Sequence, residues 1–212
     1  MSLWTSSVLS LLLLQTVQSQ AQEVNVADKP VAIEEVSGSA EEIPLRPSVT
    51  KRDWYIRQAY FDVFKILSTP NTCSNFYGGP RATTVLNDFV ARVRSDLLFR
   101  EISFQMGGKL RLIRDDSNRV WYRLFDKITV NTNGSFYQRR AEPMRNVPSD
   151  VGDFLPGTRP ARALILLHEL GHLIQGENGA WLIPDDGYDV RQSRANTFRI
   201  QEVCRVQLDA LK

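Results

Sequence analysis

The chain has 212 residues, 42% of them hydrophobic and 24% charged, which is enough apolar material for one packed domain. Most of it is therefore neither disordered nor fibrous. Two cysteines are too few for a disulfide-stapled miniprotein or a cysteine-rich zinc module, and a net charge of +2 argues against a strongly basic protein that seeks polyanions. The two histidines of the chain, His168 and His172, stand four residues apart.

Residues 1–21 predict a secretory signal peptide. They contain no charged side chain, and an apolar run at residues 8–14 is followed by small and polar residues. This run is too short to cross a hydrocarbon layer about 30 Å thick. We therefore expect a secreted or periplasmic protein with no stable membrane span after signal removal. An uncleaved anchor and an apolar cytosolic start are the alternatives.

Residues 22–48 predict a flexible acidic leader. They hold six acidic and two basic residues, three prolines and no aromatic residue, so their charge is −4. Since the first 21 residues carry no charge, removing −4 from the total of +2 leaves +6 for residues 49–212, which we take as the folded domain. These opposite charges motivate the hypothesis that the leader inhibits the domain.

Two amphipathic helices are predicted at the start of this domain. Apolar residues recur at helical spacing over residues 50–67 and again over residues 82–98. Residues 71–80, between them, predict a turn-rich connector that holds Cys73.

The following segment changes to the pattern of β-strands. Apolar and β-branched residues gather at residues 102–104, 110–113 and 120–130, with Gly107-Gly108 and a polar turn as separators. Asn133-Gly134 predicts a hairpin turn before a further short strand. We interpret these segments as a small, mostly antiparallel sheet.

Two more helices complete the predicted domain. The first has Thr158 as a possible N-cap and Pro160 in its first turn, and Gly176 is expected to close it. Its interior is apolar on nearly every side, which predicts that it is buried on nearly every side. A C-terminal helix is expected over residues 193–211. The predicted class is a single small α+β domain with two N-terminal helices, a sheet, a buried helix and a C-terminal helix.

The buried helix carries an HExxH motif, His168-Glu169-Leu170-Gly171-His172. Residues four apart on a helix point the same way, about 6 Å apart, so both imidazoles can bind one zinc ion at about 2.0–2.1 Å. Glu169 lies about 100° around the helix and can accept a proton from water whose pKa the ion lowers to roughly 7. The alternative is two core histidines bonded to backbone carbonyls, with Glu169 in an ion pair.

The segment from residue 163 to residue 174 resembles the zinc-binding helix of the zincin metallopeptidases. This resemblance implies that His168 and His172 are zinc ligands and that Glu169 is the catalytic base. The chain departs from the metzincin subgroup, because Gln175 stands where that subgroup has a glycine and no third histidine exists.

The third protein ligand is therefore expected to be a downstream oxygen donor. The candidates are Glu177, Asp185, Asp186, Asp189 and Glu202. We favour Asp186 and then Asp185, because a Pro-Asp-Asp-Gly turn presents carboxylates on a stiff backbone just after the site helix. An aspartate ligand on the loop after the site helix resembles the arrangement in the aspzincins, although their GTxDxxYG signature is absent. Glu202, on the last helix, ranks third and would be the choice similar to the gluzincins.

Several other residues receive candidate roles. Tyr188 either stabilises an oxyanion, as a Tyr or His does in many zincins, or packs behind the turn. Cys73 and Cys204 are expected to form a disulfide in an exported protein, with two buried thiols as the alternative. Asn196-Thr197 could cap or buttress the site loop, and the arginines over residues 159–162 are expected on solvated faces.

The sequence thus predicts a secreted, monomeric zinc metallopeptidase that hydrolyses peptide or protein substrates with Glu169 as general base. The block around Cys73 and the tail over residues 185–204 also resemble secreted bacterial proteins classed only as peptidases, which adds no mechanism. A non-catalytic secreted protein with a structural zinc site and a cytosolic regulatory HExxH protease are the alternatives. No motif indicates nucleic-acid binding.

Overall fold

The structure is a computed structural model that describes residues 51–98, 103–138, 151–187 and 189–212. The predicted signal peptide and acidic leader lie outside these ranges. Helices and a small sheet form one α+β unit, which confirms the predicted class. In chain order the elements are α1 (Lys51–Ser68), α2 (Thr72–Phe76), α3 (Ala82–Arg92), β1 (Val93–Asp96), β2 (Phe104–Arg114), β3 (Val120–Asn131), α4 (Arg159–Leu173) and α5 (Val190–Asp209).

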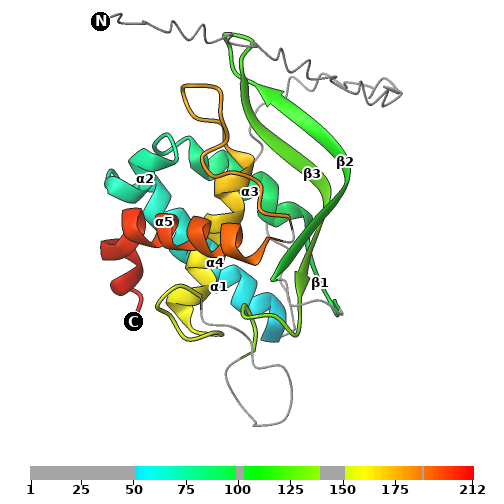
Figure 1. Cartoon of the computed structure of the whole chain (residues 1–212), viewed down its shortest axis with the longest axis vertical. Coiled ribbons are helices and arrows are strands. Elements are labelled where there is room, and N and C mark those ends of the chain that lie inside the picture. The colour runs from blue at the N-terminus through cyan, green and yellow to red at the C-terminus, as the bar shows by residue number, and fades with distance from the viewer. Residues whose placement is uncertain (1–50, 99–102, 139–150, 188) are drawn as a thin grey trace, which may run out of the picture. The chain divides into compact units, whose positions relative to one another are not determined.

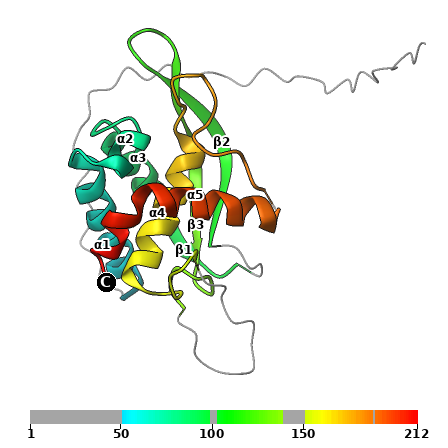
Figure 2. The same ribbon diagram turned by 60° about the vertical axis from the view of Figure 1, so that its left-hand side comes forward.

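Helix α4 lies at the centre of this unit. It contacts α1, α3, α5 and β3 (Figures 1 and 2). Every residue of α4 is buried except Arg159 and Glu169, as its apolar composition predicts. Polar side chains on this helix therefore lie in or beside a desolvated interior, where each needs a partner.

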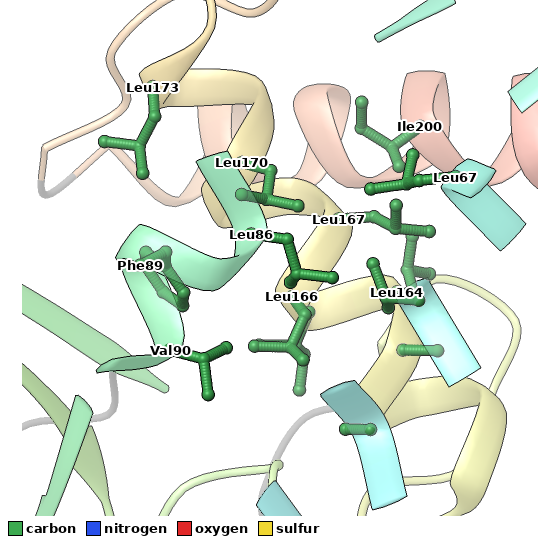
Figure 3. Packing of buried hydrophobic residues seen from close by; sticks show 14 of the residues in the cluster. Leu67, Leu86, Phe89, Val90, Leu164, Leu166, Leu167, Leu170, Leu173 and Ile200 are labelled. Atoms are coloured by element: carbon green, nitrogen blue, oxygen red, sulfur yellow. The ribbon is translucent and has the colours of Figure 1, made fainter. Parts of the chain in front are cut away.

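The leucines of α4 hold the surrounding helices together. Leu166 and Leu170 lie beside Leu86 of α3, and Leu167 lies close to Leu67 of α1 (Figure 3). All five of these leucines are fully buried, so packing holds the helix from several directions at once.

The sheet has the strand order β1-β3-β2, so β3 is central. Strands β2 and β3 pair antiparallel over most of their length, while β1 pairs parallel to β3 with Val93 opposite Ile128. The mostly antiparallel sheet is thus confirmed, and its short parallel edge is the part that the sequence pattern did not indicate.

Two predicted boundaries in this region are wrong. The helix expected over residues 82–98 ends at Arg92, because residues 93–96 pair with β3 instead of continuing the helix. Gly107-Gly108 does not separate two strands, since β2 continues through a register shift at this point. Gly108 has a φ of +80°, a backbone conformation that glycine adopts without strain.

Three further expectations are corrected by local contacts. The connector before α3 contains helix α2, which a capping box between Asn71 and Ser74 stabilises. Asn133-Gly134 lies in a turn, but further turns and not a strand follow it. Helix α4 ends at Leu173 and not at Gly176, because Ile174 is extended and bridges to β3.

Helix α5 begins at Val190, earlier than expected, because Asp189 accepts hydrogen bonds from the amides of Arg191 and Gln192 as its N-cap.

Arg162 is also placed differently from the expectation of a solvated face. It is buried, its Nε donates to the backbone oxygen of Phe136, and it thereby satisfies a carbonyl of an irregular segment.

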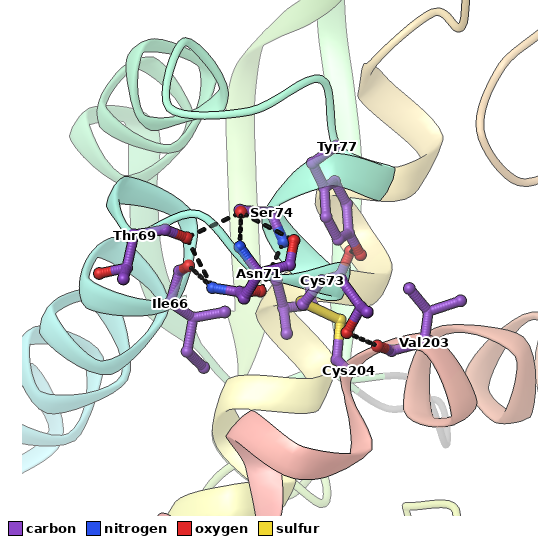
Figure 4. Close-up of a disulfide and its surroundings, with 10 residues drawn as sticks. Ile66, Thr69, Asn71, Cys73, Ser74, Tyr77, Val203 and Cys204 are labelled. Atoms are coloured by element: carbon purple, nitrogen blue, oxygen red, sulfur yellow. Dashed lines mark hydrogen bonds between the residues drawn. A yellow bond between two sulfur atoms is a disulfide. The ribbon is translucent and has the colours of Figure 1, made fainter.

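A disulfide joins Cys73 of α2 to Cys204 of α5, as predicted (Figure 4). Both cysteines are fully buried, and Thr72 Oγ1 next to them donates to the Val203 oxygen over 3.1 Å. Such a bond is compatible with an oxidising, extracellular compartment. Within the part of the chain that is described, no helix has both the length and the apolar character needed to cross a bilayer.

Replacing both cysteines, Cys73→Ala with Cys204→Ala, is expected to lower the free energy of unfolding by about 4–5 kcal/mol. The reason is that the bond constrains an unfolded chain over a separation of 131 residues. Urea denaturation of wild type and the double variant measures the difference, with reduced wild type as the control. Equal midpoints for all three proteins would contradict the expectation.

Candidate metal centre

His168 and His172 face each other on one side of α4. Their Nε2 atoms are 3.0 Å apart, and both side chains are more than nine-tenths buried, with exposed fractions of 9% and 8%. Among the described residues, neither ring bonds to a backbone carbonyl. The alternative of two core histidines satisfied by carbonyls therefore does not describe this helix.

Asp186 completes the cluster. Its Oδ2 lies 3.1 Å from His168 Nε2 and 3.4 Å from His172 Nε2. After α4 the chain folds back along the helix: the amide of Leu182 donates to the Ile174 oxygen over 3.0 Å, and the amide of Ile183 donates to the Gly171 oxygen over 3.2 Å. This antiparallel return places Asp186 next to the two rings, as the favoured prediction requires.

The spacing of the three donor atoms suits a single metal ion. Four ligands at about 2.1 Å around a tetrahedral ion lie about 3.4 Å from one another, close to the 3.0, 3.1 and 3.4 Å that separate the Nε2 and Oδ2 atoms here. No fourth His, Cys, Asp or Glu joins His168, His172 and Asp186 within the described ranges. Two nitrogens and one carboxylate oxygen are a donor set that zinc accepts.

Thr197 of α5 determines which nitrogen of His168 faces the cluster. Its Oγ1 lies 3.0 Å from His168 Nδ1 and donates to the Ser193 oxygen over 2.9 Å. Because a hydroxyl has one proton, Thr197 accepts from Nδ1–H, so Nε2 has a free lone pair when His168 is neutral. Metal-binding histidines have this arrangement.

The return segment is also held by α5. Asn196 Nδ2 donates to the Pro184 oxygen over 2.9 Å, two residues before Asp186. Asn196 and Thr197 thus buttress the site, as the sequence suggested.

The electrostatics of the cluster favour charge separation. Burial raises the pKa of Asp186, but hydrogen bonds with His168 and His172 outweigh it and leave that pKa well below its usual range. Burial lowers the pKa of His172, but the hydrogen bond with Asp186 and the charge of Glu169 outweigh it and leave that pKa above its ordinary value. A carboxylate that remains ionised among buried imidazoles is what a cation site needs.

Glu169 stands beside the cluster and not within it. Among the described residues its carboxylate has no hydrogen bond or ion pair, and it is partly exposed. Burial raises its pKa, and the nearby imidazoles of His168 and His172 oppose that change only in part. A partly desolvated, unpaired carboxyl with a raised pKa is suited to exchange a proton.

The other candidate ligands do not join the cluster. Asp189 caps α5, Glu177 is exposed on the turn after α4, and Glu202 is exposed on α5 near Phe198 and Arg205. Tyr188 lies outside the described residues, so its expected role stays a prediction.

Asp185 is bound by an arginine that sequence reasoning missed. The Arg123 guanidinium forms a two-pronged ion pair with the Asp185 carboxylate, and Arg123 Nε donates to the His172 oxygen over 2.9 Å. Arg123 also lies over the Trp181 ring, 4.3 Å from its centroid. The only sequence signal was an arginine between Tyr122 and Leu124, two positions that strand alternation places in the core.

A cavity of about 770 Å³ lies between the α2–α3 connection and the chain that follows α4. Its lining includes Tyr77, Arg81, Trp121 and Ile174, but none of the three donor residues. The cavity is therefore distinct from the metal centre.

Comparison of the chain with protein-family models, with curated proteins and with solved structures found no match in any of the three. The resemblance to zincins consequently rests on the HExxH helix and its surroundings.

Gly171 allows the return segment to approach α4. A Cβ at this position would lie 3.0 Å from two side-chain atoms of Ile183. We expect Gly171→Ala to lower the free energy of unfolding by about 1–3 kcal/mol, because the added methyl overpacks this contact. Thermal unfolding measures the loss.

The matched test is the Ile183→Ala variant, alone and combined with Gly171→Ala. Ile183→Ala leaves a cavity that the methyl group of Gly171→Ala partly fills. The double variant should therefore lose less free energy of unfolding than the sum of the losses in the two single variants. Strict additivity would show that the two residues do not meet as described.

Proposed function

We propose that the protein is an exported zinc-dependent metallopeptidase in which His168, His172 and Asp186 bind the metal and Glu169 is the general base. The observation that carries this proposal is the set of three donor atoms, 3.0–3.4 Å apart, at a buried HExxH helix. The proton on His168 Nδ1, assigned through Thr197, supports it further, because this leaves Nε2 available to a ligand.

A zinc ion at these residues would supply Lewis acidity, which polarises a peptide carbonyl and lowers the pKa of water. The chain supplies the remaining functions. Asp186 contributes the negative charge, Thr197 orients one imidazole, and Glu169 accepts a proton from the attacking water and passes it to the leaving amine. Burial raises the pKa of Glu169, and a raised pKa favours uptake of the proton from water.

Two observations favour this function over a structural metal site. Structural zinc sites generally have four protein ligands, whereas three candidate donors gather here among the described residues. Glu169 is partly buried without a hydrogen bond or ion pair among the described residues, and burying an unpaired carboxylate is unfavourable. A general base accounts for both its position and its lack of a partner.

Asp186→Asn is expected to weaken zinc binding at least tenfold, because the ion loses an anionic ligand. Competition titration against a chromogenic chelator measures the dissociation constant. Glu202→Gln, the matched change on the exposed face of α5, should leave it unchanged. If Glu202→Gln weakened binding and Asp186→Asn did not, the third ligand would be wrongly assigned.

Glu169→Gln is expected to keep about one zinc per chain and to lose hydrolysis by at least 100-fold, because removal of a general base costs about 10²–10⁴ in rate. Metal analysis and cleavage of denatured casein or a mixed peptide library measure the two properties. Glu177→Gln, the same change on the exposed turn after α4, is the control and should be as active as wild type. Metal-free wild type, or an active Glu169→Gln variant, would contradict the proposal.

A further inference from the structure

We infer that Arg123 is a positioning residue of the metal centre, which acts through Asp185 to hold the neighbouring Asp186 against His168 and His172. This inference rests on the proposed metal site. It assigns a role to a strand residue that donates no ligand and touches none of the three donor atoms.

Arg123 connects three parts of the chain around the site. Its Nε donates to the His172 oxygen at the end of α4, and its two terminal nitrogens bind both carboxylate oxygens of Asp185. Its guanidinium plane covers the ring of Trp181 on the return segment. The Arg123 side chain is only 12% exposed, so water weakens its hydrogen bond with the His172 oxygen less than it would at the surface.

The contact with His172 completes the C-terminal cap of the site helix. The last carbonyls of a helix lack partners within it. Here the Gly171 oxygen accepts from the Ile183 amide, and the His172 oxygen accepts from Arg123. The turn that carries His172 is thus fixed from the return segment and from β3, and the positive charge of Arg123 lies where the helix dipole favours it.

The contact with Asp185 fixes the other half of the site. Asp185 is 63% exposed and adjacent to Asp186, so the ion pair restrains the backbone from which Asp186 reaches the rings. Asp185 Oδ1 also lies 3.8 Å from His172 Nδ1, slightly beyond hydrogen-bond distance. That nitrogen is buried and has no hydrogen-bond partner among the described residues.

Asp185 therefore stands where a metal-binding histidine commonly finds the carboxylate that orients its second nitrogen. Arg123 keeps Asp185 at that place. His168 is thus oriented by its hydrogen bond with Thr197, whereas the Asp185 carboxylate lies 3.8 Å from His172 Nδ1 without a hydrogen bond to it.

The shape of the arginine side chain matters as well as its charge. The planar Arg123 guanidinium donates from Nε to the His172 carbonyl and from its two terminal nitrogens to the Asp185 carboxylate. A lysine ammonium cannot reproduce this fork. Arg123→Lys should therefore behave like Arg123→Gln.

The test compares zinc affinity in full-length wild type, Arg123→Lys, Arg123→Gln, Asp185→Asn and the Arg123→Gln/Asp185→Asn double variant, by chelator competition. We expect each single change to weaken binding about 10–100-fold, the range for loss of a residue that orients metal ligands. The double variant should be little weaker than Arg123→Gln alone, because both changes remove the same contact. Arg111→Gln, on the exposed face of β2, is the matched control and should bind zinc like wild type.

The outcomes separate this inference from the proposed function. A wild type that binds no zinc would overturn both. A wild type that binds zinc, with Arg123 variants of equal affinity, would leave the metal site in place and overturn the role of Arg123. Thermal unfolding without metal shows whether each variant is folded. If the Arg123 variants are unfolded, the zinc affinity of Asp185→Asn, a change at an exposed residue, is the test. Unchanged zinc affinity in that variant overturns the inference.

Discussion

The contact between two buried imidazoles and one half-buried carboxylate is the constraint on which the rest of the structure depends. His168 and His172 are buried in a helical core and Asp186 is half-buried beside them, and ionisable groups removed from water need partners. They find those partners in one another, with distances of 3.0–3.4 Å between donor atoms. Their three donor atoms lie close together, and this geometry is the basis of the proposed metal site.

The elements around α4 each serve this cluster through a different contact. Helix α5 supplies Thr197 to one imidazole, and the return segment supplies Asp186. Strand β3 supplies Arg123, which links the end of α4 to the return segment. The close approach of that segment is possible because Gly171, inside the motif, has no side chain. The site is therefore built from helix, loop and strand, and contacts from α5, the return segment and β3 meet at α4.

The disulfide belongs to the same arrangement. Helix α5 is covalently held near its C-terminal end by Cys204, while its N-terminal half contacts the site through Asn196 and Thr197. Anchoring at one end limits how α5 can move relative to α4. A compartment that allows the bond to form thus also favours an ordered site.

The sequence by itself determined the features that depend on neighbours in the chain. The spacing of His168 and His172, the burial of their helix and the α+β class follow from helical period and composition, while turn chemistry only ranked Asp186 before Asp185 and Glu202 as a third ligand. Only the tertiary structure decided that residues 93–96 form a parallel strand, that Arg162 is buried and that Arg123 holds Asp185. Arg123 is 62 positions from Asp185 and 49 from His172, and no local pattern encodes a contact whose partners meet only when a strand, a helix end and a loop pack together.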